Sequence, residues 1–264
     1  MNYQTYPAPG SLSDVVRFFW SLDSAMEGAA AHRLTADPCS GIVFVCRGAF
    51  TEEHGASTPA GHIAGPWQCW MNNMAHGPYS LFGAYLWPWG AKALFGVALD
   101  PRSNSVRGLS DLKGGNALCK GVLAAHDHAH RVLYLSEALS LQLPVPSGSD
   151  GLLEVAIKDL FAARTLPTVD ELVRKSGLAR RQFERRFKAC TGSSPALFLR
   201  IVRFQRTYRM LENGEASSLT EVASAAGYFD QSHFIRDFKR FSGSNPRDYF
   251  IKAPEKVDNF VRLP

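Results

Sequence analysis

The sequence carries the same capped two-helix pattern twice in its C-terminal half, and this repeat limits the fold more than any other feature. Residues 168–177 align with residues 218–227, fifty positions on. Each copy begins with Thr or Ser followed three residues later by Glu, which is the capping box that starts a helix. Each copy also ends in glycine, Gly177 or Gly227, which favours a tight turn after the first helix.

A second helix is predicted directly after each turn, and the later one has the clearer pattern. Asp230 is placed to cap it, and Phe234, Phe238 and Phe241 recur at i, i+4 and i+7, on one helical face. The opposite face carries polar and basic side chains. A helix, a glycine turn and a second amphipathic helix form the helix-turn-helix pattern.

The alignment continues through both second helices at an offset of 51, after one extra residue in the later turn. Two copies are too few for a solenoid, which needs roughly three or more repeats, so a tandem pair of binding units is the simpler interpretation. The aligned pairs are Phe183 with Phe234, Arg185 with Arg236, Phe187 with Phe238, and Lys188 with Lys239.

The run from Ala223 to Phe234 (Ala-Ser-Ala-Ala-Gly-Tyr-Phe-Asp-Gln-Ser-His-Phe), followed by Asn245-Pro246, resembles the signature of AraC/XylS-type transcription regulators. The resemblance covers residues 168–250 and implies two helix-turn-helix units joined by a long helix. It implies double-stranded DNA and RNA polymerase as partners. The earlier unit departs from the family pattern at Ala179, where a Ser is common near the start of the recognition helix.

The outward faces of the two second helices supply the candidate DNA contacts. Base readout falls near the start of a recognition helix in the major groove, and Lys and Arg further along meet phosphates. Glu184 can instead form an i±4 salt bridge with Arg180 or Lys188, and Arg200, Arg203 and Arg206 are interpreted mainly as a solvated face. The base-reading candidates are Arg181, Glu184, Arg185, Gln231, Ser232, Ile235 and Arg236, and the phosphate candidates are Arg180, Lys188, Lys239 and Arg240.

Charge separates the chain into two parts. Residues 1–150 hold 9 Lys and Arg against 11 Asp and Glu, whereas residues 151–264 hold 20 against 13. A basic half beside a nearly neutral half suits a polyanion-binding domain joined to a separate sensor. We therefore expect a sensor or dimerisation domain over 1–145, a linker over 146–151, a tandem helix-turn-helix domain over 152–252 and a tail over 253–264.

The first part is expected to be mainly β-structure, which gives an α+β chain overall. Leu12 to Trp20 has helical spacing, and its residues resemble the opening of AraC-type regulators with a cupin-like first domain. Residues 33–97 contain short apolar runs bounded by Gly and Pro, typical of an antiparallel sandwich or barrel. Helical spacing returns from Val122 to Leu143, as a helix that either mediates a homodimer or covers the barrel.

Two residue groups in the first part suggest a ligand site. Trp67, Trp70, Trp87 and Trp89 can line a pocket for a small-molecule effector, or can simply belong to the core. His126, His128 and His130 can hold a metal, but no partnering Glu or Cys follows at a motif spacing, so a polar helix start is favoured. We expect no metal site, no cofactor and no catalytic residues, and thus no enzyme. The rival hypotheses are a cupin-type metal-dependent enzyme with an accessory DNA-binding domain, and a regulator whose first domain is only an interaction module.

Five cysteines without a C-x-x-C spacing favour reduced thiols and a cytoplasmic protein. The chain shows no export signal pattern and no apolar run of the roughly 18 residues that a membrane span needs. We therefore expect no membrane partner.

Overall fold

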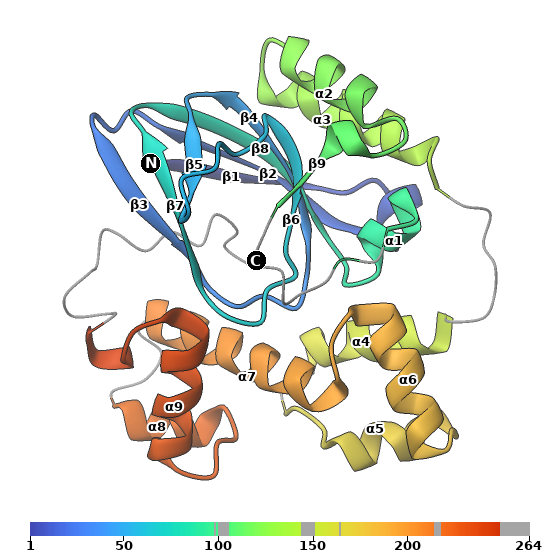
Figure 1. Ribbon diagram of the computed structural model, residues 1–264. Coiled ribbons are helices and arrows are strands. Elements are labelled where there is room, and N and C mark those ends of the chain that lie inside the picture. The colour runs from blue at the N-terminus through green and yellow to red at the C-terminus, as the bar shows by residue number, and fades with distance from the viewer. Residues whose placement is uncertain (98, 100–105, 144–150, 164, 214–217, 249–264) are drawn as a thin grey trace.

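The computed structural model describes all residues except 98, 100–105, 144–150, 164, 214–217 and 249–264 (Figure 1). The tail expected over 253–264, and all but the last residue of the linker expected over 146–151, lie outside the described residues.

Two antiparallel sheets form the N-terminal part and face each other as an open barrel (Figure 1). The larger sheet has six strands and the smaller has three. In spatial order the large sheet contains β1 (Asn2–Pro7), β2 (Val16–Ser24), β8 (Tyr79–Leu86), β4 (Gly41–Arg47), β6 (Gly61–Ala64) and β9 (Arg107–Gly108), and the small sheet contains β3 (Ala29–Leu34), β7 (Met71–His76) and β5 (Phe50–Glu52).

The helix expected over Leu12 to Trp20 was a wrong prediction. The segment forms a short 3₁₀ turn over Gly10–Leu12 and then enters strand β2. Strand β2 pairs along its two edges with β1 and β8, and its two faces enter two hydrophobic clusters, Phe19 in one and Trp20 in the other, so nearly every residue in it is buried. A short run of β-branched and aromatic residues buried on both faces has no clean alternation, and its spacing imitates a helix.

Three helices pack on the outside of the large sheet: α1 (Gly90–Phe95), α2 (Gly115–Ala124) and α3 (His128–Ser140). The single helix expected over Val122 to Leu143 is broken, because Asp127 accepts from the His130 N–H at 2.9 Å and starts α3 afresh. Leu135 and Leu139 of the apolar stripe are fully buried against this chain's own core. The stripe therefore covers the barrel.

The C-terminal part is helical and confirms the α+β prediction. Helix α7 runs beneath the barrel and joins the two helix-turn-helix units at its ends (Figure 1). No helix among the described residues is long and apolar enough to cross a membrane. The elements are α4 (Gly151–Ala162), α5 (Val169–Ser176), α6 (Arg180–Thr191), α7 (Pro195–Glu212), α8 (Leu219–Ala225) and α9 (Gln231–Ser242).

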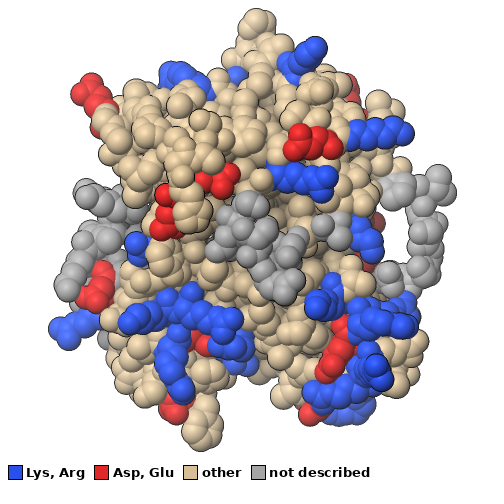
Figure 2. Space-filling model, viewed as in Figure 1, with Lys and Arg blue, Asp and Glu red and all other residues tan. Residues whose placement is uncertain are grey.

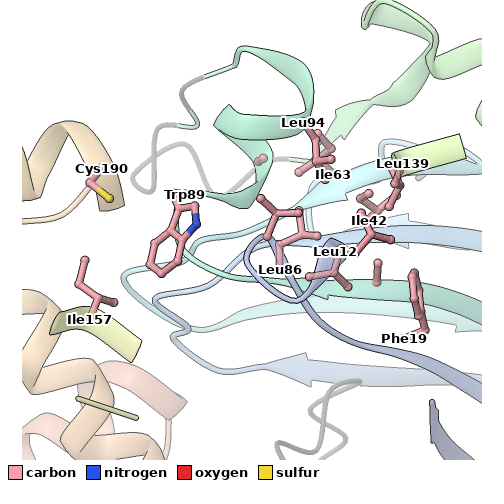
Figure 3. Packing of buried hydrophobic residues seen from close by; sticks show 14 of the residues in the cluster. Leu12, Phe19, Ile42, Ile63, Leu86, Trp89, Leu94, Leu139, Ile157 and Cys190 are labelled. Carbon is pink, nitrogen blue, oxygen red and sulfur yellow. The ribbon is translucent and has the colours of Figure 1, made fainter. Parts of the chain in front are cut away.

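The main hydrophobic core does not stop at the edge of the barrel. It continues from the large sheet through Trp89 to Ile157 on α4 and Cys190 on α6, as Figure 3 shows. A separate cluster around Phe204 and Phe238 fills the second helix-turn-helix unit. The first unit thus shares its core with the barrel, and the second has its own.

Candidate nucleic-acid interface

The first helix-turn-helix unit consists of α5 and α6 and begins with a complete capping box. The Thr168 hydroxyl accepts from the Glu171 N–H at 3.2 Å, and the Thr168 N–H donates to the Glu171 carboxylate at 2.8 Å. The turn passes through Gly177 at φ 66°, a left-handed conformation that glycine adopts without a steric penalty. Phe183 and Phe187 are then buried on the inner face of α6.

The second unit consists of α8 and α9 and presents its recognition helix with a side-chain cap. The Asp230 carboxylate accepts from the His233 N–H at 2.6 Å, whereas Ala179 gives α6 no side-chain cap. Phe234, Phe238 and Phe241 are each fully buried, as their spacing predicts.

An ion pair fixes α9 to α7. The Arg200 guanidinium contacts both carboxylate oxygens of Asp237, at 2.5 and 3.3 Å, and the Asp237 side chain is only 2% exposed. Sequence reasoning missed Asp237 because its partner lies 37 residues away. The interpretation of the α7 arginines as a solvated face was wrong. Arg203 stacks over the Tyr228 ring at 5.3 Å, and Arg206 donates to the Leu160 carbonyl at 2.6 Å.

The sequence-predicted contact residues all lie on α6 or α9, and most lie on the faces turned away from the phenylalanines; Ile235 packs against the core of the second unit, and Arg240 lies over the Phe241 ring at 5.8 Å. Glu184 and Ile235 are half-buried, and the remainder are exposed. Lys and Arg side chains gather over the helical part on the face drawn in Figure 2. The exposed candidates are Arg180, Arg181, Arg185, Lys188, Gln231, Ser232, Arg236, Lys239 and Arg240.

On α6, part of this charge is already paired within the unit. Arg180 contacts Glu184 at 3.1 Å and Asp170 at 2.6 Å, and the hydrogen bond to Glu184 together with the Asp170 charge raises the pKa of Arg180. The salt bridge considered for Glu184 is therefore present.

The four tryptophans singled out from the sequence do not share one site. Trp67 lines a cavity inside the barrel. Trp70 lies over Gly243 at the end of α9, where an added Cβ would come within 2.6 Å of the Trp70 ring. Trp87 and Trp89 stack on each other at 5.6 Å, and Trp87 meets Phe161 of α4 edge to face.

The histidine run contributes to helix α3. His128 contacts Asp23 at 3.0 Å, and His130 contacts the capping residue Asp127 at 2.9 Å. Within the described residues, no three His, Cys, Asp or Glu side chains lie close enough together to hold a metal ion.

Comparison with known proteins places the two units in a family. A family model described as a helix-turn-helix domain matches residues 172–251. A putative AraC-like transcription regulator of Streptomyces antibioticus is 38% identical over 82 residues, 31% of this chain and 27% of that protein. Residues 172–251 are an AraC/XylS-type helix-turn-helix domain.

Other matches to this AraC-type chain concern the same region. The HTH-type transcriptional regulator MtrA of Neisseria gonorrhoeae is 33% identical over 88 residues, 33% of this chain and 29% of that protein. The chain therefore spans less than a third of the length of these curated relatives. The solved DNA-binding domain of AdpA, a global transcriptional factor in complex with a target DNA, is 32% identical and covers 40% of this chain and 99% of that one, with a TM-score of 0.35.

The barrel of the AraC-type chain matches a second family model, over residues 4–106. That model is described as a domain of unknown function. What the barrel does must therefore be inferred from its own residues.

Proposed function

We propose that this AraC/XylS-type protein binds double-stranded DNA at specific sequences and regulates transcription. The observation that carries the proposal is a pair of recognition helices, α6 and α9, each held from behind by buried phenylalanines and each presenting exposed Arg, Lys or Gln side chains. Guanidinium and amide groups are the side chains that pair bidentately with base edges in the major groove.

The helix between the units has a suitable length for this function. α7 has 18 residues, which at about 1.5 Å per residue gives about 27 Å. Successive major-groove segments on one side of DNA lie about 34 Å apart. α6 and α9 lie at opposite ends of α7 (Figure 1), so one chain is proposed to contact two such segments.

Each candidate residue has a proposed role. Gln231 pairs with adenine and Arg236 with guanine, and Ile235 contacts a thymine methyl group. Ser232, Arg181 and Arg185 also contact base edges. The Glu184 carboxylate gives up its hydrogen bond from Arg180 and accepts one from the N4 amino group of cytosine instead. Arg180, Lys188, Lys239 and Arg240 bind phosphates, which position the protein without specifying sequence.

The AraC/XylS type also suggests further partners and a location. We include in the proposal RNA polymerase, a small-molecule effector in the barrel, a second copy of the chain, a non-enzymatic role and a cytoplasmic location. The barrel over 1–145 acts as the sensor and 152–252 as the DNA-binding domain. Light scattering of the purified chain, with and without DNA, measures whether it forms a dimer.

Selection from a random DNA library with the full-length chain tests the central claim. The expected result is an enriched sequence with two half-sites about 10–10.5 base pairs apart, both protected in footprinting. Arg107→Ala, an exposed arginine on the barrel, serves as the matched control and should select the same sequence. Failure to enrich any sequence would exclude sequence-specific binding.

A further inference from the structure

A cavity lies inside the barrel, between the two sheets, with a volume of about 90 Å³. Its walls come from both sheets, including Val43 on β4 and Phe50 on β5. One side is closed by α7 of the DNA-binding part, through Gln205 and Tyr208. The cavity therefore has a wall from each part of the chain.

Five buried polar atoms around this cavity have no hydrogen-bond partner among the described residues. They are the indole Nε1 of Trp20 and Trp67, the hydroxyls of Ser40 and Thr58, and Oδ1 of Asn73. Buried polar groups are nearly always paired in folded proteins, because leaving one unpaired costs its hydration. Five such atoms around one cavity indicate a site for a molecule that supplies the missing partners.

The other tryptophans provide an internal comparison. Away from the cavity, the Trp87 indole donates to the Ser13 carbonyl at 2.9 Å, and the Trp89 indole donates to the Asp14 carbonyl at 2.8 Å. The fold thus pairs its indole N–H groups at these positions. Trp20 and Trp67, whose N–H groups are unpaired, are those that line the cavity.

The charged side chains at the cavity already interact with other groups of the chain. The buried Asp37 carboxylate already accepts from the Tyr85 hydroxyl at 2.7 and 2.8 Å and from the Cys39 N–H at 2.8 Å. Burial lowers the pKa of His62 to about 4, so this side chain is neutral near pH 7. Arg209, at the α7 end of the cavity, has an interaction partner of its own. An ion would lose its hydration here and would have to displace these interactions to gain a counter-charge.

We propose that the barrel cavity binds a small uncharged molecule with a flat apolar body, a hydrogen-bond acceptor for the indole N–H groups of Trp20 and Trp67, and a donor for the amide oxygen of Asn73. The apolar walls cover the body, and the polar atoms orient it. This inference rests on the proposed function, because it names the chemical class of the effector.

Three single-ring probes of matched size and shape test the charge preference: benzamide, benzoate and benzamidine. Calorimetric titration of the full-length chain is expected to show benzamide binding at least tenfold more tightly than either ion. Benzamide should also raise the melting temperature and change tryptophan fluorescence. Tighter binding of benzoate or benzamidine, or binding of none of the three at millimolar concentration, would overturn the proposal.

Trp67→Phe tests the hydrogen bond, because it removes the unpaired N–H and replaces the indole by a smaller ring. Trp89→Phe loses the same ring atoms and N–H outside the cavity, so it is the matched control. Benzamide affinity is expected to fall several-fold in Trp67→Phe and to stay unchanged in Trp89→Phe. Equal benzamide affinities for Trp67→Phe and the wild type would contradict the proposal.

Unliganded stability gives a second measurement that needs no ligand. Trp67→Phe and Trp89→Phe should both melt lower than the wild type, because each loses the same apolar ring atoms from the core, but Trp89→Phe should lose more, because the Asp14 carbonyl also loses its partner. An equal or larger loss for Trp67→Phe would show that its N–H is already satisfied. DNA selection is scored separately, so a chain that binds benzamide but enriches no DNA would refute only the regulator function.

Discussion

The two helix-turn-helix units share one sequence pattern but are held in place differently. The recognition helix of the first unit, α6, lacks a side-chain cap, and its unit shares a hydrophobic core with the barrel through Cys190 and Phe187. The recognition helix of the second unit, α9, has the Asp230 cap and the buried Arg200–Asp237 ion pair, and its unit has a core of its own. Equivalent motifs therefore need not be equally stable.

The barrel contacts the second unit as well, through hydrogen bonds and through Ala36, which is buried in the core of that unit. The Ala36 N–H donates to the Phe241 carbonyl at 2.9 Å, and Arg33 donates to the Ser244 hydroxyl at 2.6 Å while lying over the Trp70 ring. The second unit therefore shares fewer buried apolar residues with the barrel than the first unit does.

The largest expected effect comes from breaking the ion pair of the second unit. Arg200→Met should lower the free energy of unfolding by about 2–3 kcal/mol, because Asp237 is left buried with its charge uncompensated. This loss is smaller than the loss expected for a fully buried ion pair, because the Arg200 side chain is itself 36% exposed. Chemical denaturation followed by circular dichroism measures it.

Arg180→Met is the matched control in the first unit, because Arg180 also pairs with carboxylates but at the surface. This substitution should change the free energy of unfolding little, because solvent screens the charges of exposed ion pairs. If Arg180→Met lowered the free energy of unfolding as much as Arg200→Met, the two ion pairs would contribute equally and the units would not differ in this respect.

The next effect concerns DNA affinity at equivalent positions of the two units. Arg236→Ala and Arg185→Ala should each weaken binding to the selected sequence by about 1–3 kcal/mol and relax preference in one half-site. Gel shifts with both half-sites, and with each half-site scrambled, assign each loss to its unit. A loss confined to Arg236→Ala would mean that the first unit does not read bases.

The helix caps predict a smaller effect. Asp230→Ala should destabilise the chain by about 1 kcal/mol, because the first turn of α9 loses its side-chain acceptor. Ala179→Asp should act in the opposite direction by giving α6 the cap it lacks. Thermal unfolding of both variants measures the two changes, and a neutral Asp230→Ala would show that α9 is held by packing alone.

The smallest effect is a dependence on pH in the first unit. Hydrogen bonds from the Thr168 N–H and hydroxyl lower the pKa of Glu171 below its ordinary 4.5. A carboxylate with a lowered folded-state pKa contributes stability above its unfolded pKa, and this contribution is lost as pH falls through the folded value.

Glu171→Gln tests this pH dependence. The variant should be less stable than the wild type at neutral pH, and the gap should close in acid, below about pH 4. Melting curves across that range measure it, with Glu53→Gln, an exposed loop carboxylate, as the control. A gap that stays constant with pH would show that the carboxylate charge plays no part in the cap.

The helical part could be predicted from the sequence because its signals are local. The capping residues Thr168 and Asp230 and the turn glycine Gly177 lie within a few residues of the turns they cap, and the burial of Phe183 and Phe238 follows from their spacing. The roles assigned to exposed residues such as Arg236 remain predictions.

The rest depends on pairings between distant residues. Strand β2 was taken for a helix because the strands that pair with its edges and the clusters that bury its two faces are not evident from its own residues. The Arg200–Asp237 pair joins positions on different helices. Trp20 and Asn73 line one cavity from different sheets, and no sequence spacing brings them together.

Helix α7 belongs to both parts of the molecule at once. It joins the two DNA-reading units, and its residue Gln205, which donates to the Ala36 carbonyl at 3.4 Å, also lines the barrel cavity. A ligand in the cavity that favours one position of α7 relative to the barrel must change the affinity for DNA. DNA must then change the affinity for that ligand by the same factor. Under the proposed function, the operator therefore changes the ligand affinity of the barrel as much as the ligand changes the affinity for the operator.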